Sequence, residues 1–294
     1  MRLLRVALLF LCWALAAPAC APPPAPADPA LWRVADGDSE IWLFGGVHVL
    51  APHFAWRSRR VNAAFDTAET VVFEADLDAM NADAFNALVR REGLAARGQT
   101  LSSRLNAEEQ ARLRRAAARV GVDPEGLEPL RPWLAALQLT LAFSRKSGGD
   151  PANGVEAVLG AEARRRGKRL MFLETPEAQI RTLAGLSPAA EHAFLVASLR
   201  QIERGPGPAQ NMDEAWRRGD TATLARLLHD DIAEAGDETY AALVTRRNAR
   251  FAEKIRAMLA GRGRIFVAVG AAHLVGPDGV PALLRAQGLM VEGP

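Results

Sequence analysis

The stretch Ile265-Phe266-Val267-Ala268-Val269-Gly270-Ala271-Ala272-His273 decides how this chain of 294 residues folds. Its first five residues are all apolar, which is typical of a strand that is buried on both faces of a sheet. The glycine that follows lets the backbone turn sharply as the strand ends. We therefore expect a buried strand that delivers His273 to a crevice at the edge of the sheet.

The same arrangement occurs a second time, more than 220 residues earlier in the chain. There, Ile41-Trp42-Leu43-Phe44 runs into Gly45-Gly46-Val47-His48. Two further apolar segments, residues 71–73 and 171–173, run into Glu74 and Glu174. In open α/β sheets, functional sites assemble at the carboxyl ends of the strands. The pattern predicts one site built from His48, Glu74, Glu174 and His273.

The rest of the chain predicts an α/β fold with a central mixed sheet, built from N- and C-terminal strands, and a large helical middle region. Residues 31–34 and 41–44 flank Asp36-Gly37-Asp38, a hairpin signal. Asn106 and Glu109 have the spacing of a capping box, so we expect a helix that ends near Gly121. Strands are expected at 31–34, 41–44, 70–73, 168–173, 264–269 and 289–291, helices at 59–68, 106–121, 155–166, 221–235 and 239–259 and from 132 and 187, and a loop at 205–208.

The N-terminus predicts export. Arg2 and Arg5 precede a short apolar run, and Ala17-Pro18-Ala19 offers the small residues that a signal peptidase reads. Cleavage there would leave Cys20 at the front of a proline-rich tether. We expect a signal peptide at 1–19, a tether at 20–30 and a single α/β domain at 31–294. Cys20 predicts a lipid anchor on an outer-membrane lipoprotein of a Gram-negative bacterium, and the alternative is a soluble periplasmic protein.

Composition excludes several classes of protein. The chain holds 36 Lys plus Arg against 34 Asp plus Glu, and the predicted leader removes two arginines and no acid. A formally neutral mature chain is not a nucleic-acid binder. With 49% hydrophobic residues, it has enough apolar side chains for a large core. Serine hydrolases, zincin peptidases, kinases and dinucleotide enzymes lose support because their short motifs are absent from the sequence.

Two imidazoles and two carboxylates are suitable ligands for a divalent transition metal such as Mn, Co or Zn. Such an ion would generate hydroxide near neutral pH. One of the carboxylates, Glu74 or Glu174, could instead act as general base, and the sequence does not distinguish them. Asp76 is an alternative to Glu74, and His53 is an alternative third histidine. Arg246-Arg247-Asn248, on a predicted helix, could orient a substrate carboxylate or carbonyl.

At these residues the sequence resembles the TraB/GumN family, which includes bacterial pheromone-shutdown proteins and the animal Tiki proteins. The resemblance covers about residues 31–291 and rests on the order and spacing of several modest motifs. They are Leu31-Trp32-Arg33-Val34, Gly45-Gly46-Val47-His48, Val72-Phe73-Glu74, Leu130-Arg131-Pro132-Trp133, Gly154-Val155-Glu156, Leu173-Glu174-Thr175, Arg247-Asn248 and Val269-Gly270-Ala271-Ala272-His273.

The resemblance implies an α/β fold similar to the erythromycin-esterase and ChaN-like proteins, and a metal-dependent peptidase. Carried over by position, His48 and His273 would be metal ligands, Glu74 and Glu174 ligand or base, with Arg247 and Asn248 in support. Family members often have a glutamate where this chain has Arg246, and an aspartate where it has Glu156. The first difference leaves activity open.

Two function hypotheses follow from the sequence. The first is an exported metal-dependent hydrolase that acts on a peptide or a small polar substrate. The second is a non-catalytic envelope protein that binds a peptide or assists polysaccharide export. An ester-cleaving enzyme is a weaker third possibility.

Overall fold

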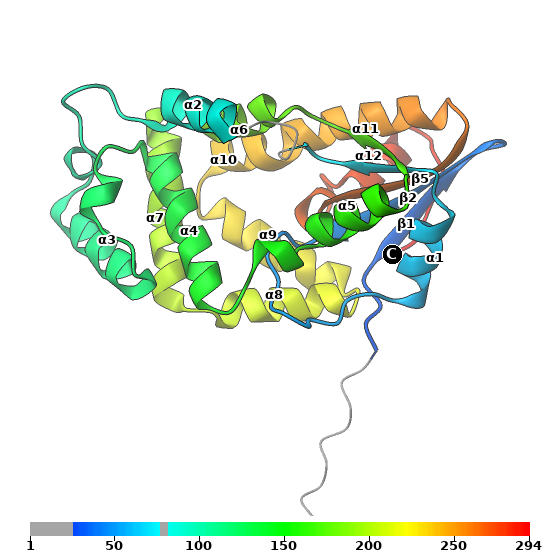
Figure 1. Cartoon of the computed structure of the whole chain (residues 1–294), viewed down its shortest axis with the longest axis horizontal. Helices are drawn as coiled ribbons and strands as arrows, with labels where there is room; N and C mark the ends of the chain where they lie inside the picture. Colours follow the sequence, from blue (N-terminus) through cyan, green and yellow to red (C-terminus); the bar gives the residue numbers. More distant parts are fainter. Residues whose placement is uncertain (1–25, 77–81) are drawn as a thin grey trace, which may run out of the picture.

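The computed structural model describes residues 26–76 and 82–294, and within them lies a six-stranded sheet (Figure 1). The strand order is β4-β3-β5-β2-β1-β6. The four strands β4, β3, β5 and β2 run parallel. At the other edge, β1 pairs antiparallel with β2, and β6 pairs antiparallel with β1. The strands are β1 (Leu31–Ala35), β2 (Ser39–Gly46), β3 (Thr70–Phe73), β4 (Arg169–Phe172), β5 (Gly263–Gly270) and β6 (Val291–Glu292).

The apolar residues of the central strands alternate between two layers because successive side chains point to opposite faces. In β5, Ile265, Val267 and Val269 face one layer, and Phe266 and Ala268 face the other. Both faces are therefore covered, as the unbroken apolar run of this strand predicts.

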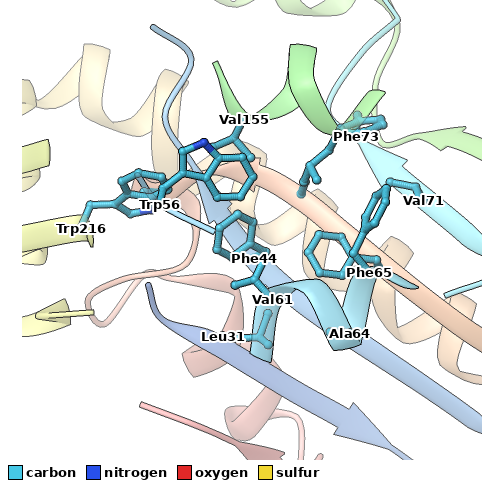
Figure 2. Packing of buried hydrophobic residues seen from close by; sticks show 14 of the residues in the cluster. Leu31, Phe44, Trp56, Val61, Ala64, Phe65, Val71, Phe73, Val155 and Trp216 are labelled. Carbon is cyan, nitrogen blue, oxygen red and sulfur yellow. The ribbon is translucent and has the colours of Figure 1, made fainter. Parts of the chain in front are cut away.

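Helices from distant parts of the chain cover the two faces. On one face, α1 (Arg59–Thr67), α5 (Val155–Arg165) and α8 (Gly207–Arg217) pack on an aromatic cluster of Phe44, Trp56, Phe65, Trp216 and Phe266 (Figure 2). On the other face, α11 (Arg246–Leu259) and α12 (Val280–Ala286) pack on the odd-numbered residues of β5. The sheet is thus the middle layer of an α/β sandwich.

A separate helical lobe lies beside the sheet, at the left of Figure 1. Its core is made by α3 (Ala107–Val120), α4 (Pro132–Lys146) and α7 (Pro188–Arg204), with Trp133 fully buried. The remaining helices are α2 (Ala82–Gly93), α6 (Pro176–Ala184), α9 (Thr221–Ala233) and α10 (Asp237–Tyr240). The large helical middle region expected from the sequence is therefore confirmed.

Several local predictions are confirmed and others are wrong. The Asn106–Glu109 capping box is present, and Gly121 ends α3 in the left-handed conformation. The expected loop at 205–208 is shorter than predicted, because only Gly205 and Pro206 lie between helices. The helix α8 begins at Gly207, and Pro208 lies in its first turn, where a missing N–H does no harm. The expected strand at 289–291 is displaced, because pairing with β1 begins only at Val291. The single helix expected at 239–259 is divided into α10 and α11 by a turn of π-helix at Ala241–Thr245.

The predicted signal peptide and Cys20 lie outside the described residues. Within the described ranges, none of the helices combines the length and apolar composition needed to cross a membrane.

Candidate functional site

The parallel strands bring the four predicted residues to one edge of the sheet. Gly46 at the end of β2 pairs with Gly270 at the end of β5. The hydrogen-bonded pairing of β3 with β4 extends beyond the strand ends, because the Glu174 N–H donates to the Glu74 carbonyl at 2.7 Å. His273 follows in a short 3-10 turn, η6 (Ala271–His273), directly after β5. The strand ends therefore place these acids and His273 side by side, with His48 in the loop after β2.

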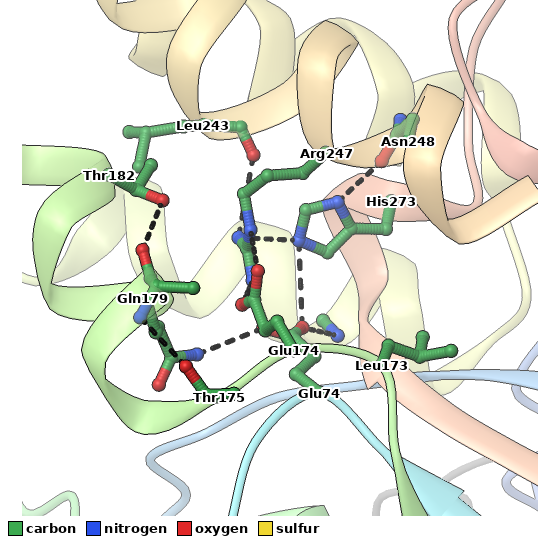
Figure 3. Close-up of polar contacts among 12 residues, drawn as sticks. Glu74, Leu173, Glu174, Thr175, Gln179, Thr182, Leu243, Arg247, Asn248 and His273 are labelled. Carbon is green, nitrogen blue, oxygen red and sulfur yellow. Dashed lines mark hydrogen bonds and ion pairs between the residues drawn. The ribbon is translucent and has the colours of Figure 1, made fainter. Parts of the chain in front are cut away.

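A chain of hydrogen bonds fixes the protonation of His273 (Figure 3). The Asn248 amide Nδ2 donates to the Asp278 carbonyl at 2.7 Å, which turns Asn248 Oδ1 toward His273 Nδ1 at 2.5 Å. Because an amide oxygen only accepts, Nδ1 carries the proton and Nε2 keeps its lone pair. Burial lowers the pKa of His273 to about 4, although Glu74 opposes this effect, so the imidazole is neutral at pH 7.

Arg247 of α11 is the cation at the centre of the site. Its Nη2 donates to Glu74 Oε2 at 2.5 Å and to Glu174 Oε1, while Nη1 donates to His273 Nε2 at 2.9 Å. The side chains of Arg247 and both acids are less than 10% exposed. Without this guanidinium, two negative charges would face each other in a buried setting.

Glu74 is held in its charged form. Burial alone raises its pKa, but His273 once protonated, Arg247, His48 and the N–H of Gly270 together lower it to about 2. The Gly270 N–H donates to Glu74 Oε1 at 2.6 Å, and Gln179 of α6 donates to Oε2 at 3.2 Å. Glu74 is therefore a fixed negative charge throughout the physiological pH range.

His48 has the opposite character to His273. Its side chain is 62% exposed, and its Nδ1 forms an ion pair with Glu156 Oε2 at 3.2 Å. The charge of Glu156 is the main reason that the pKa of His48 is raised to about 9. Neither oxygen of Glu156 accepts a hydrogen bond from the described residues. The two Gly-x-x-His histidines thus differ in charge at pH 7, one a cation at the surface and the other a neutral buried ring.

The bare Cα of Gly270 leaves a gap between these groups. A methyl group at this position would lie 3.1 Å from His48 Nε2, 3.2 Å from Glu74 Oε1 and 3.6 Å from His273 Cδ2. The side chains of His48, Glu74 and His273, each with a possible metal-ligand atom, therefore surround one small space. His273 Nε2 and Glu74 Oε1 are 3.5 Å apart across it.

The other predicted candidates have different surroundings. Asp76 pairs with Arg164 at 3.5 Å. His53 is exposed in the loop after β2, at a positive φ of 62°. Arg246 is exposed, whereas its neighbours Arg247 and Asn248 are buried in the site. A carboxylate at position 246 would accordingly lie outside the buried group.

Sequence reasoning missed some of the residues that complete the site. Glu156 was considered only as part of a family motif, and Gln179 and Lys254 were not considered as site residues. Lys254 Nζ donates to the Leu173 carbonyl, directly before Glu174. A pocket of about 890 Å³, lined by Glu174, Thr175, Glu177, Arg250 and Lys254 among others, opens at this end of β4. Only contacts across the fold reveal these roles, apart from the position of Glu156 in the motif.

Replacing Glu156 with glutamine should lower the pKa of His48 from about 9 toward 6.5 or below, because it removes the charge that stabilises the imidazolium. The change is measurable by NMR titration of the imidazole resonances in chelator-treated protein. Glu177→Gln, which removes an exposed acid, is the control and should leave the pKa of His48 unchanged. A pKa of His48 that stays near 9 in Glu156→Gln would contradict the assignment of the ion pair.

As the side chains stand, the described residues include no group of three or more His, Cys, Asp and Glu residues arranged to hold a metal ion. His273 Nε2 instead accepts a hydrogen bond from Arg247 Nη1 at 2.9 Å. In this arrangement, the guanidinium is the positive charge that faces Glu74 and Glu174.

The sequence profile of the TraB/PrgY/gumN family matches residues 30–293. The chain belongs to the TraB/PrgY/gumN family. The chain is also 25% identical over 257 residues to "Uncharacterized protein YbaP" of Escherichia coli (strain K12), an alignment that covers 87% of this chain and 92% of YbaP. The protein of the same name from Shigella flexneri matches with the same identity and coverage. The family match confirms the resemblance inferred from the motifs.

Proposed function

We propose that this TraB/PrgY/gumN protein is a metal-dependent hydrolase, specifically a peptidase, that works at the carboxyl ends of β2, β3 and β5. The observation that carries the proposal is the convergence at Gly270. Two histidines from widely separated Gly-x-x-His segments and the permanently charged Glu74 surround the space that a side chain at position 270 would fill.

The chemistry of this donor set fits a divalent transition metal. His48 Nε2, His273 Nε2 and Glu74 Oε1 would hold the ion, a combination of two imidazoles and one carboxylate. Binding would require His48 to lose its proton and Arg247 Nη1 to move away from His273 Nε2. Each histidine has its Nδ1 beside an oxygen of another side chain, Glu156 or Asn248, as metal-binding histidines usually do. Bound there, the ion would lower the pKa of a water ligand toward about 7.

The protein's own residues prepare the site in three ways. Asn248 holds His273 in the tautomer that leaves Nε2 free of a proton. Arg247 forms ion pairs with both acids and helps to keep Glu74 ionised. Glu174, which lines the 890 Å³ pocket, would accept a proton from water as general base.

We also propose that the chain is exported and attached through a lipid on Cys20. The support is the sequence of the leader and the position of Cys20 after it. Mass spectrometry of the mature N-terminus should find a lipid-modified Cys20. An unmodified mature N-terminus in the soluble periplasmic fraction would contradict the anchor and leave export intact.

The test of the catalytic proposal is turnover of a defined peptide mixture, analysed by mass spectrometry with and without a chelator. We expect cleavage that the chelator abolishes, and a fall of about 10²–10⁴-fold in His273→Gln, the range that general acid–base and metal-site losses produce. Persistent cleavage in chelator or in His273→Gln would contradict the proposal.

Gly270→Ala tests the convergence itself. The added methyl group would fill the space between His48 and Glu74 without straining the backbone, whose φ is −53°. We expect at least a tenfold loss of turnover in a folded protein. Gly37→Ala is the matched control, because a methyl group there meets nothing within 4 Å. Equal activity in the two variants would show that the space is not used.

The second hypothesis, a non-catalytic binding protein, rested partly on the missing acid at position 246. Since Arg246 is exposed, that difference gives little support to a loss of catalysis. Saturable peptide binding without any cleaved product would favour this hypothesis.

A further inference from the structure

A second pocket, distinct from the Gly270 site, lies between the sheet and the helical lobe. We call it the α4–α8 pocket, and its volume is about 420 Å³, within the range of small-ligand sites. Its apolar walls come from the loop after β2 and from α4. Val47, Val49 and Phe54 belong to the loop, and Phe143 belongs to α4. Because Val47 and Val49 are the neighbours of His48, whatever binds here touches the loop that carries His48.

The charged residues that line this pocket are all acidic. The lining includes the acids Asp213 and Glu214 and no Lys, Arg or His residue. Glu214 is already paired with Arg217 at 2.7 Å. Gln201, also in the lining, donates to Asp231 at 3.1 Å. These polar groups are therefore already engaged.

Asp213 is different from these residues. Among the described residues, no hydrogen bond or ion pair reaches its half-buried carboxylate. Burial without a compensating charge raises the pKa of Asp213 to about 6, so it still carries a charge at pH 7.5. A partly desolvated, unpaired carboxylate costs stability unless a cation joins it.

We propose that the α4–α8 pocket binds an apolar chain that ends in an ammonium or guanidinium group, with the chain against Val47, Val49, Phe54 and Phe143 and the cation on Asp213. The aromatic rings suit this ligand as well, since they attract cations at their faces. A lysine or arginine side chain of the peptide substrate supplies this chemistry, and this last step rests on the proposed function. The pocket would then be a specificity site beside the His48 loop.

The test is isothermal titration calorimetry of the full chain with two capped pentapeptides, in which a central lysine or norleucine is flanked by alanines, and with hexylamine. We expect the lysine peptide and hexylamine to bind the wild type. The norleucine peptide, whose side chain has the same carbons as lysine but no terminal ammonium group, should bind at least about tenfold more weakly. Equal binding of both peptides, or no binding of either the lysine peptide or hexylamine, would overturn the proposal. Binding of hexylamine without binding of the lysine peptide would overturn the peptide assignment.

Two variants locate the binding. Asp213→Asn should weaken the binding of the lysine peptide to the level of the norleucine peptide. The melting temperature of this variant at pH 7.5 should be equal to or above that of the wild type. Glu214→Gln is the control from the same pocket and should change the affinity less than threefold, because its carboxylate is already paired. Equal losses in the two variants would contradict a specific role for Asp213. Tight binding of lysine peptides that are never cleaved would support the pocket and reject the proposed peptidase, so the two failures are distinguishable.

Discussion

Replacing Arg247 with methionine should lower the free energy of unfolding by about 3–5 kcal/mol, the usual result of removing one partner from a buried ion cluster. The variant leaves Glu74 and Glu174, which share the Nη2 atom of Arg247, as two buried acids without their common cation. Urea denaturation at pH 7 measures the effect. The neighbouring Arg246→Met is the control, because Arg246 is exposed and its loss should change stability by no more than about 0.5 kcal/mol.

A double variant keeps this prediction testable if Arg247→Met does not fold. Adding Glu174→Gln removes one of the two repelling charges, so Arg247→Met with Glu174→Gln should recover part of the lost stability. A decrease below about 1 kcal/mol in Arg247→Met alone, or no recovery in the double variant, would show that the guanidinium does not hold the acids together.

The metal-free protein should also lose stability steeply in acid, for two separate reasons. The pKa of Glu74 is lowered to about 2, so this acid stabilises the fold above pH 4.5 and loses that contribution as the pH falls toward 2. The pKa of His273 is lowered to about 4, so the unfolded chain takes up its proton first and stability is lost as the pH falls from 6.5 to 4. Each shift corresponds to roughly 3 kcal/mol.

The two contributions can be separated by their pH ranges. In denaturant titrations at successive pH values, His273→Gln should flatten the stability profile between pH 6.5 and 4, and also part of the profile below pH 4.5, because protonated His273 helps to lower the pKa of Glu74. Glu74→Gln should flatten it between pH 4.5 and 2. A wild-type profile that is level between pH 6.5 and 2, or identical slopes in all three proteins, would contradict these assignments.

Much of the sheet was predictable because local patterns determine it. The apolar runs before His48, Glu74 and His273 are short and largely buried, and turn residues mark their ends. The run before Glu174 forms the edge strand β4 and is only half-buried. Parallel strands place their carboxyl ends at one edge, so the approximate location of the site followed from the same patterns. The structure brings Glu74, Glu174, His273, Arg247 and Asn248 into contact, with His48 close to Glu74 across the gap at Gly270.

The charge states inside the site were not predictable from the strand ends. They depend on α11 and α5, which reach the site from other layers of the fold. Arg247 lies 173 residues from Glu74 in sequence, and only packing shows that its guanidinium joins both acids and His273. The pairing of Glu156 with His48 is likewise a contact between distant segments. Two histidines in the same short motif consequently differ in charge at pH 7, one a cation and the other neutral, which the motif itself does not reveal.

The most direct test of the proposed hydrolytic centre is the metal content of the protein. Equilibrium dialysis against Mn, Co and Zn, followed by elemental analysis, should find one ion per wild-type chain. The ion should be absent from folded His48→Ala and from folded His273→Ala, because each variant removes one of the three donors around Gly270. No ion in the folded wild type, or one ion retained by both variants, would contradict the account.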